Sequence, residues 1–228
     1  MAIHQIELKK KIALTHDVFE LVYSFPEDTR FQAGQFITFL LPVIWGRAYS
    51  ILEKRKDEIV LIIKRRSLEN GGRGGSIALC DGSVWNIFKA VGPVGHFVLQ
   101  NTKTPKCFIG TGTGFVPLYS HFTTALENGF TEKLLFIFGV RKGIDLFYLE
   151  ELKNLSLKYK NFSFILSTSQ EEMDWCHKGY VTDLISEEVT EEYWEYYICW
   201  APAMIDASIE KLKGLWINEA NIYFEKYA

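Results

Sequence analysis

The sequence predicts two domains: an N-terminal antiparallel β-barrel over residues 1–100, and an α/β domain with a five-stranded parallel sheet over residues 101–228. Two observations support this division. The first half contains short runs of β-branched and aromatic residues separated by turn signals, the pattern of a small antiparallel barrel. After the polar stretch Asn101–Pro105, apolar runs alternate with amphipathic helical segments, which is typical of a parallel sheet covered by helices.

Turn signals bound the predicted strands of the first half. The charged stretch Glu53–Glu58 separates two apolar runs, which predicts a hairpin with a solvated tip. After the glycine cluster Asn70–Gly75 we expect a helical turn capped by Ser76. The predicted strands are Ile3–Leu14, Val18–Phe25, Phe36–Leu41, Arg47–Leu52, Ile59–Lys64 and Val84–Val91.

The second half is organised around Cys107–Pro117, where an apolar run passes through glycines 110, 112 and 114 into a helix. Such a turn allows close backbone approach and presents free N–H groups to a phosphate. Its G-x-G-x-G spacing is not the dinucleotide fingerprint G-x-G-x-x-G, so a simple βα turn remains the alternative to nucleotide binding. Further strands are predicted at Leu134–Val140, Phe162–Ser167, Tyr196–Cys199 and Asn221–Phe224, and helices at Asp145–Lys158, Thr182–Glu188 and Pro202–Lys213.

Composition excludes several classes of protein. A net charge of -3 is too small to indicate binding to nucleic acid or to an anionic membrane. The longest apolar run, Phe36–Trp45, is shorter than the ~20 residues that span a bilayer. The four cysteines and five histidines have no metal-ligand spacing, so we expect no iron–sulfur cluster, no zinc and a reducing, cytoplasmic location.

Six motifs resemble the ferredoxin–NADP reductase superfamily, in the same order and over nearly the whole chain. Each motif is weak by itself, and their order makes the resemblance specific. They are Arg47–Ser50 (R-x-Y-S), Gly74–Ser76 (a glycine-serine turn), Gly92–Phe97 (G-P-x-G-x-F), Gly110–Gly114 followed by Pro117, Phe138–Arg141 followed by Asp145–Tyr148, and Tyr197–Met204 (similar to Y-x-C-G-P-x-x-M).

The resemblance implies a flavin in the barrel and a nicotinamide nucleotide in the second domain. It implies that Tyr49 stacks on the flavin ring, Ser50 binds the reactive edge of that ring, and Cys199 lies beside the nicotinamide; these are the catalytic candidates. Without the other motifs, Arg47 would be a surface arginine and Tyr49 a barrel-core aromatic. The implied cofactor-binding residues are Arg47, Tyr49, Ser50, Lys64, Gly74, Gly75, Ser76, Gly110, Thr111, Gly112, Thr113, Gly114, Pro117, Arg141, Asp145, Cys199 and Phe224.

The activity that the resemblance implies is hydride transfer from NAD(P)H to a bound flavin. FAD is expected, with FMN as the alternative, because Gly71–Ser76 also resembles phthalate dioxygenase-type reductases. NADH is favoured, because Ser167–Glu172 contains no Arg or Lys for a 2′-phosphate. One departure from the family pattern is Trp200, which replaces the usual glycine and is expected to crowd the nicotinamide or reshape the turn.

The electron acceptor is expected to be a separate molecule. The dispersed cysteines do not form a [2Fe–2S] motif, and the chain ends directly after the last predicted strand. An iron–sulfur protein is the favoured acceptor, and free flavin is the alternative. A third interpretation is a flavin-binding electron-relay subunit without catalysis of its own.

Overall fold

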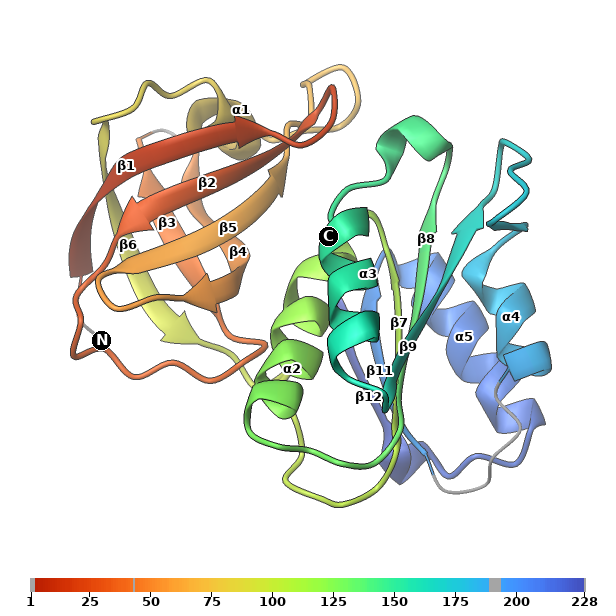
Figure 1. Ribbon diagram of the computed structural model, residues 1–228. Helices are drawn as coiled ribbons and strands as arrows, with labels where there is room; N and C mark the ends of the chain where they lie inside the picture. Colours follow the sequence, from red (N-terminus) through yellow and green to blue (C-terminus); the bar gives the residue numbers. More distant parts are fainter. Residues whose placement is uncertain (1–2, 43, 189–193, 228) are drawn as a thin grey trace. The chain divides into compact units, whose positions relative to one another are not determined.

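The computed structural model describes residues 3–42, 44–188 and 194–227, and the chain divides into two compact units (Figure 1). The first unit comprises residues 1–99 and 119–121, and the second comprises residues 100–118 and 122–228. The polar stretch that begins at Asn101 therefore lies directly after the end of the first unit.

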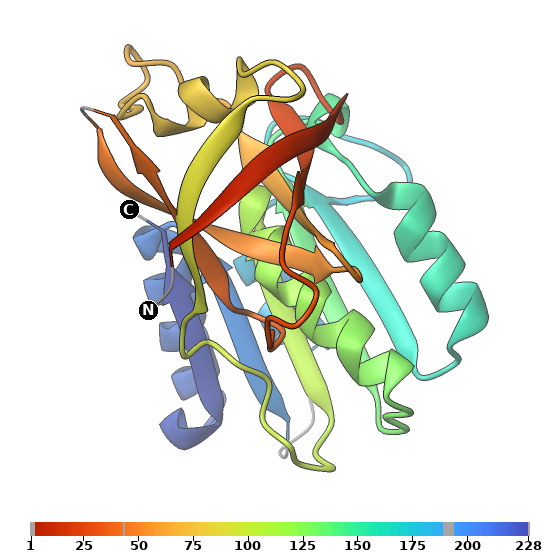
Figure 2. The ribbon, with the colours of Figure 1, turned by 90° about the vertical axis from the view of Figure 1, so that its left-hand side faces the viewer.

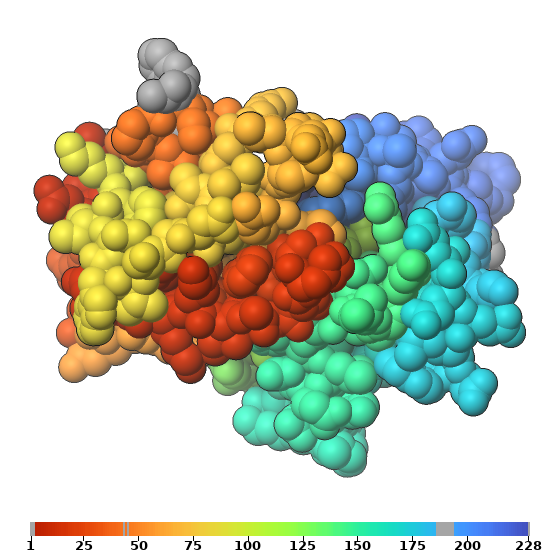
Figure 3. All heavy atoms as spheres, turned by 90° about the horizontal axis from the view of Figure 1, so that it is seen from above, coloured from red at the N-terminus to blue at the C-terminus, as the bar shows by residue number. Residues whose placement is uncertain are grey.

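The first unit contains a closed antiparallel barrel with the strand order β1-β2-β5-β4-β3-β6, which confirms the predicted architecture. Strands β1 (red) and β6 (yellow) pair from Ile3–Glu7 to Ile87–Val91 and are seen side by side in Figures 2 and 3. The elements are β1 (Ile3–Ala13), β2 (Val18–Ser24), β3 (Phe36–Leu41), β4 (Trp45–Lys54), β5 (Glu58–Lys64), α1 (Gly75–Cys80) and β6 (Ile87–Val94).

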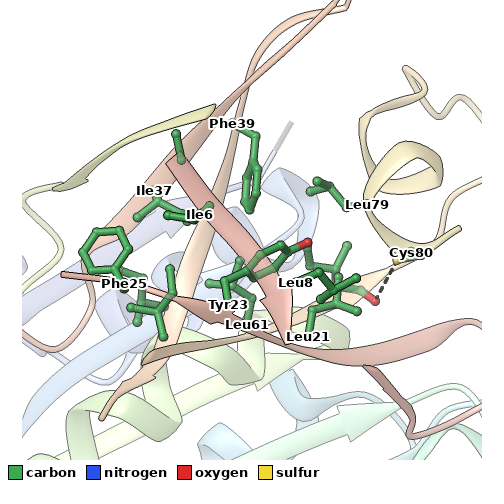
Figure 4. Packing of buried hydrophobic residues seen from close by; sticks show 14 of the residues in the cluster. Ile6, Leu8, Leu21, Tyr23, Phe25, Ile37, Phe39, Leu61, Leu79 and Cys80 are labelled. Atoms are coloured by element: carbon green, nitrogen blue, oxygen red, sulfur yellow. Dashed lines mark hydrogen bonds between the residues drawn. The ribbon is translucent and has the colours of Figure 1, made fainter. Parts of the chain in front are cut away.

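Alternating side chains of the strands fill the barrel. In β5, Ile59, Leu61 and Ile63 point inward and join one buried cluster. Figure 4 shows Tyr23 and Phe39 inside this cluster, with their ring centroids 5.2 Å apart. The two-residue period of the sequence therefore places the core as expected.

Strand β6 begins three residues later than predicted. The backbone N–H of Asn86 donates to the carbonyl oxygen of Ser83 at 3.0 Å, and the Asn86 side chain accepts from the Ser83 N–H at 2.7 Å. Between them Trp85 has a φ of 79°. This turn interrupts the apolar run that the sequence presents as one strand.

The second unit contains a parallel sheet with the strand order β10-β9-β8-β7-β11-β12. The five predicted strands are present, and the two-residue β10 adds a sixth beside β9. The elements are β7 (Lys106–Thr111), η1 (Gly112–Gly114), α2 (Phe115–Glu127), β8 (Leu134–Val140), η2 (Gly143–Asp145), α3 (Leu149–Lys158), β9 (Phe162–Thr168), β10 (His177–Lys178), α4 (Val181–Glu188), β11 (Glu195–Trp200), α5 (Pro202–Gly214), η3 (Glu219–Asn221) and β12 (Ile222–Lys226).

Helices cover both faces of this sheet, α2 and α3 on one face and α4 and α5 on the other (Figure 1). Cys107 and Ile109 of β7 belong to the apolar cluster that α4 and α5 complete. Phe108, between them, points to the opposite face and contacts Phe122 of α2 at 5.7 Å between ring centroids. A strand buried on both faces explains the continuous apolar run in the sequence.

Helix α3 starts four residues later than predicted. Gly143–Asp145 forms a separate 3₁₀ turn, and Tyr148 has a left-handed backbone with φ 60°. The left-handed residue separates this turn from the helix. Within the described ranges, no helix is both long and apolar enough to cross a membrane.

Candidate functional site

Strand β4 and the start of α1 bring Arg47, Tyr49 and Gly75 together. A methyl group built on Gly75 would lie 2.6 Å from Cγ of Arg47 and 3.0 Å from the Tyr49 hydroxyl. Only glycine therefore leaves room for both side chains at this point. The Tyr49 ring also meets Phe39 edge-on at 5.9 Å, and burial raises the pKa of the Tyr49 hydroxyl above its ordinary value.

The Arg47 guanidinium is only partly satisfied by the protein. Its Nη1 donates to the carbonyl oxygen of Gly46 at 2.9 Å. Its Nε is buried and has no hydrogen-bond partner among the described residues. A buried guanidinium nitrogen without an acceptor is costly, so this atom suits an anionic group.

Ser76 does not cap α1, which corrects the expectation from the sequence. The residue before the helix is Gly74, in a left-handed conformation with φ 85°, and the structure records no side-chain cap. The Ser76 hydroxyl instead accepts a hydrogen bond from the backbone N–H of Arg66 at 3.0 Å. It therefore ties the loop after β5 to α1.

Two other predicted flavin residues of the barrel have different surroundings. Ser50 is buried in β4, opposite Phe36 of β3. The Lys64 ammonium forms an ion pair with Asp17, 2.8 Å from the carboxylate oxygen. The structure shows no contact of Lys64 with Arg47, Tyr49 or Gly75 in the described part of the barrel unit.

In the second unit, the glycine turn packs against the end of β11. A methyl group on Gly114 would collide with the carbonyl oxygen of Cys199, and one on Gly110 would lie 2.7 Å from Leu118. Gly112 has a φ of 50° and faces the Trp200 ring. These glycines therefore allow the turn, α2 and β11 to approach closely, and sequence reasoning had not foreseen the Cys199 contact.

The remaining residues of this motif have distinct positions. Thr111 ends β7 in an extended conformation, and Thr113 is buried. Pro117 lies in the first turn of α2, where the backbone N–H groups lack intrahelical partners and proline is tolerated.

Cys199 is fully buried at the end of β11, between Gly110 of β7 and Glu225 of β12 in the sheet register. Burial raises the pKa of the thiol well above 9, and a hydrogen bond with the Tyr227 side chain opposes this only in part. Cys199 is therefore a neutral thiol. Its chemistry is that of a small packing group rather than a nucleophile.

Trp200 follows Cys199 with a φ of 148°, a backbone conformation that favours glycine. Its indole ring meets the Tyr227 ring at 5.7 Å between centroids, and its carbonyl oxygen accepts from the Tyr227 N–H at 3.0 Å. Tyr227 lies in none of the motifs. Only the pairing of β11 with β12 brings it to this site.

Arg141 and Asp145 flank a second loop at the carboxyl end of β8. Asp145 accepts from the backbone N–H of Lys142 at 3.1 Å, and Glu171 accepts from the N–H of Gly143 at 2.6 Å. The loops after β8 and β9 are thereby joined, and Arg141 is exposed at their edge.

Phe224 is the predicted cofactor-binding residue of β12. It lies on β12, its side chain is 47% exposed, and the Lys226 ammonium lies 5.5 Å from its ring centroid. In the described ranges no group of three or more His, Cys, Asp or Glu side chains is arranged to hold a metal ion.

The oxidoreductase NAD-binding domain family matches residues 108–210, from β7 into α5. The chain is 28% identical to the toluate 1,2-dioxygenase electron transfer component of Pseudomonas putida, over 87% of this chain and 59% of that protein. It is 30% identical to the propane 2-monooxygenase reductase component of Gordonia sp. (strain TY-5), over 95% of this chain and 63% of that protein. The chain thus spans about three fifths of the length of these curated relatives.

A solved structure with a similar fold is the Amycolatopsis cytochrome P450 reductase GcoB. The TM-score is 0.90 at 25% identity, and the match covers 99% of this chain and 69% of the other. Both units therefore have counterparts within one known protein.

Proposed function

This chain belongs to the ferredoxin reductase-type FAD/NAD-binding superfamily of oxidoreductases, and from that premise we propose that it is an NAD(P)H-dependent flavoprotein reductase. When bound, the flavin accepts a hydride from the reduced nicotinamide and passes electrons onward. The single observation that carries the proposal is the buried, unpartnered Nε of Arg47, held with Tyr49 around Gly75.

Arg47, Tyr49 and Gly75 are the residues that fit a flavin best. The Arg47 guanidinium offers a planar set of donors to a phosphate group, and Tyr49 offers an aromatic surface to the ring system. Gly74 and Ser76 fix the loop beside them, and Ser50 lies one residue further along β4. We assign FAD to this site, with FMN as the alternative.

The second unit holds the nicotinamide nucleotide in this proposal. The turn Gly110–Gly114 and Pro117 form the phosphate side of the site, and Arg141 and Asp145 border the loop after β8. Cys199 positions the nicotinamide by packing rather than by ionising, because its thiol is neutral. Replacing Cys199 with Ala is expected to slow flavin reduction in stopped-flow experiments more than it weakens nucleotide binding; an unchanged rate would leave Cys199 a packing residue only.

In this proposal the electron acceptor is a separate protein. Two relatives are named as components of a dioxygenase and a monooxygenase, which suggests that the acceptor belongs to an oxygenase system. We infer an iron–sulfur protein of a reducing compartment such as the cytoplasm. The competing function is reduction of free flavin, for which the chain would need no resident flavin.

The purified protein tests the flavin site directly. It should be yellow, and the flavin released on denaturation should have the mass of FAD. Arg47→Met should weaken flavin binding by roughly tenfold to a hundredfold, because a charge-assisted hydrogen bond contributes ~1.5–3 kcal/mol. Arg55→Met is the matched control, since Arg55 pairs with Glu53 at the exposed β4–β5 turn. A colourless protein that takes up neither FAD nor FMN would disprove the proposal.

Gel filtration separates the two functions. A reductase with a resident flavin keeps its colour on the column, oxidises NADH with an artificial acceptor, and reduces a ferredoxin-like protein in a salt-sensitive reaction. Loss of flavin on the column, with saturable reduction of added FMN or riboflavin, would favour the flavin reductase. Retained flavin without NADH oxidation would indicate the relay subunit.

A further inference from the structure

Trp200 lies at the point where the strand order of the second unit reverses. From β7 the chain builds β8 and β9 on one side and β11 and β12 on the other. In open parallel sheets, ligands bind outside the carboxyl ends of the strands at such a point. Trp200 is the last residue of β11, and Gly112 follows the end of β7.

The Trp200 ring covers the glycine turn. Its Cζ2, Cε2 and Cη2 atoms lie 3.2, 3.4 and 3.4 Å from the position of a methyl group built on Gly112. On the Tyr227 side, the two rings meet at an angle of 61°. The indole therefore fills the space above Gly112 in which a ligand ring would otherwise lie.

The backbone of Trp200 is in a sparsely populated conformation. A φ of 148° is strained for a bulky residue and persists only where the surroundings hold it. Here the register Trp200↔Lys226 and the hydrogen bond from the Tyr227 N–H hold it. Strain of this kind favours a second conformation once a ligand competes for the space.

We propose that Trp200 controls access of the nicotinamide ring to the carboxyl ends of β7 and β11. The indole lies against Gly112 in this structure, and the nicotinamide half of the dinucleotide displaces it on binding. Trp200 must break its contacts with Gly112 and Tyr227 when the nicotinamide ring binds, and this cost weakens dinucleotide binding. Trp200 thus determines specificity between ligands with and without the ring. This inference rests on the proposed binding of a nicotinamide nucleotide by the second unit.

The test compares two ligands that differ in the nicotinamide half. ADP-ribose lacks the ring, and tetrahydro-NADH carries a ring that cannot donate a hydride. Both are titrated calorimetrically into the oxidised, flavin-containing protein and into Trp200→Gly. Trp216→Gly is the matched control, because Trp216 also has a positive φ, of 64°, but follows α5 and is 94% exposed.

Trp200→Gly should bind tetrahydro-NADH about fivefold more tightly, as expected when an aromatic contact no longer has to be broken. ADP-ribose should bind all variants within about twofold of the wild type, because it makes no contact that depends on Trp200. Equal changes for both ligands, or no change for either, would overturn the inference while leaving nucleotide binding intact. If the wild type binds neither ligand, the proposed function fails and the inference falls with it.

Tryptophan fluorescence gives a second measurement that tolerates a poorly folding glycine variant. Tetrahydro-NADH should change the emission of the wild type and of Trp216→Gly, because Trp200 leaves its contacts with Gly112 and Tyr227. The change should be absent in Trp200→Phe. A signal that persists in Trp200→Phe comes from another tryptophan and contradicts the displacement of Trp200.

Discussion

The thiols of this protein differ in burial, which predicts that they differ in reactivity. Cys80, Cys107 and Cys199 are buried, whereas Cys176 is partly exposed, and none of these four forms a disulfide. Burial raises the pKa of Cys199 well above 9, so only a very small fraction of this thiol is the reactive thiolate at neutral pH. Sequence alone did not distinguish Cys199 from Cys176 in this respect.

Alkylation measures this difference. With iodoacetamide at pH 8.5 we expect Cys176 to be labelled much faster than Cys199, as followed by peptide mass spectrometry. Alkylation requires the thiolate, so at each pH up to 9 the labelling rate of the fully buried Cys199, whose pKa lies well above 9, should stay far below that of the partly exposed Cys176. All four cysteines should react at similar rates in urea. Equal labelling of Cys199 and Cys176 in the folded protein would contradict a neutral buried thiol.

At the scale of elements, the second unit depends on how closely the turn after β7 approaches β11. A methyl group on Gly114 would overlap the carbonyl group of Cys199 in β11. The backbone φ of Gly114 is -60°, a value that any residue can adopt, so its conformation does not require glycine. Glycine is required here because a side chain would not fit against β11. Gly114 of the glycine turn therefore has a structural role as well as being a candidate ligand contact.

Gly114→Ala should lower the free energy of unfolding of the second unit by ~1–3 kcal/mol, the usual cost of overpacking. Gly214→Ala at the end of α5 is the control, because a methyl group there meets no atom within 4 Å. Urea denaturation followed by circular dichroism measures both. A Gly114→Ala protein as stable as Gly214→Ala would show that β11 can shift to accommodate the methyl group.

A buried ion pair joins the amino ends of β7 and β11. The Lys106 ammonium lies 2.7 Å from the Glu195 carboxylate and donates to the Thr102 hydroxyl at 2.8 Å. Thr102 and Tyr197 donate to Glu195 at 2.7 and 3.0 Å. Both charges are thus desolvated and satisfied by partners.

Glu195→Gln leaves the Lys106 charge buried without a counter-ion, which should destabilise the second unit by about 3–5 kcal/mol. Lys153→Met breaks an exposed pair with Glu150 and should cost less than about 1 kcal/mol. Urea unfolding of both variants, compared with the wild type by their midpoints, measures these two effects. A small effect of Glu195→Gln would mean that water enters the pair.

At the scale of the whole molecule, the preference for NADH that we propose rests on charges from separate loops. Glu171 binds the N–H of Gly143, and Glu172 pairs with Lys178 at 2.8 Å, so carboxylates border the carboxyl ends of β8 and β9. A ribose hydroxyl can donate to such groups, whereas a 2′-phosphate is repelled by them.

The chain should therefore use NADH with a kcat/KM about tenfold higher than that for NADPH. Steady-state oxidation with an artificial acceptor measures this ratio. As a check on binding alone, 2′,5′-ADP should inhibit less strongly than 5′-AMP. Equal or better use of NADPH would show that Arg141, Lys142 or Lys178 turns towards the phosphate.

The sequence by itself determined the two-domain architecture, because the two-residue strand period and the strand–helix alternation are local signals. It also located the motifs that carry Arg47, Tyr49, Gly75 and the glycine turn. Only the tertiary structure decided that Ser76 binds Arg66 rather than capping α1, and that Trp200 adopts a positive φ against Gly112. These features join residues from separate segments, so loop paths and strand register decide them rather than local propensity.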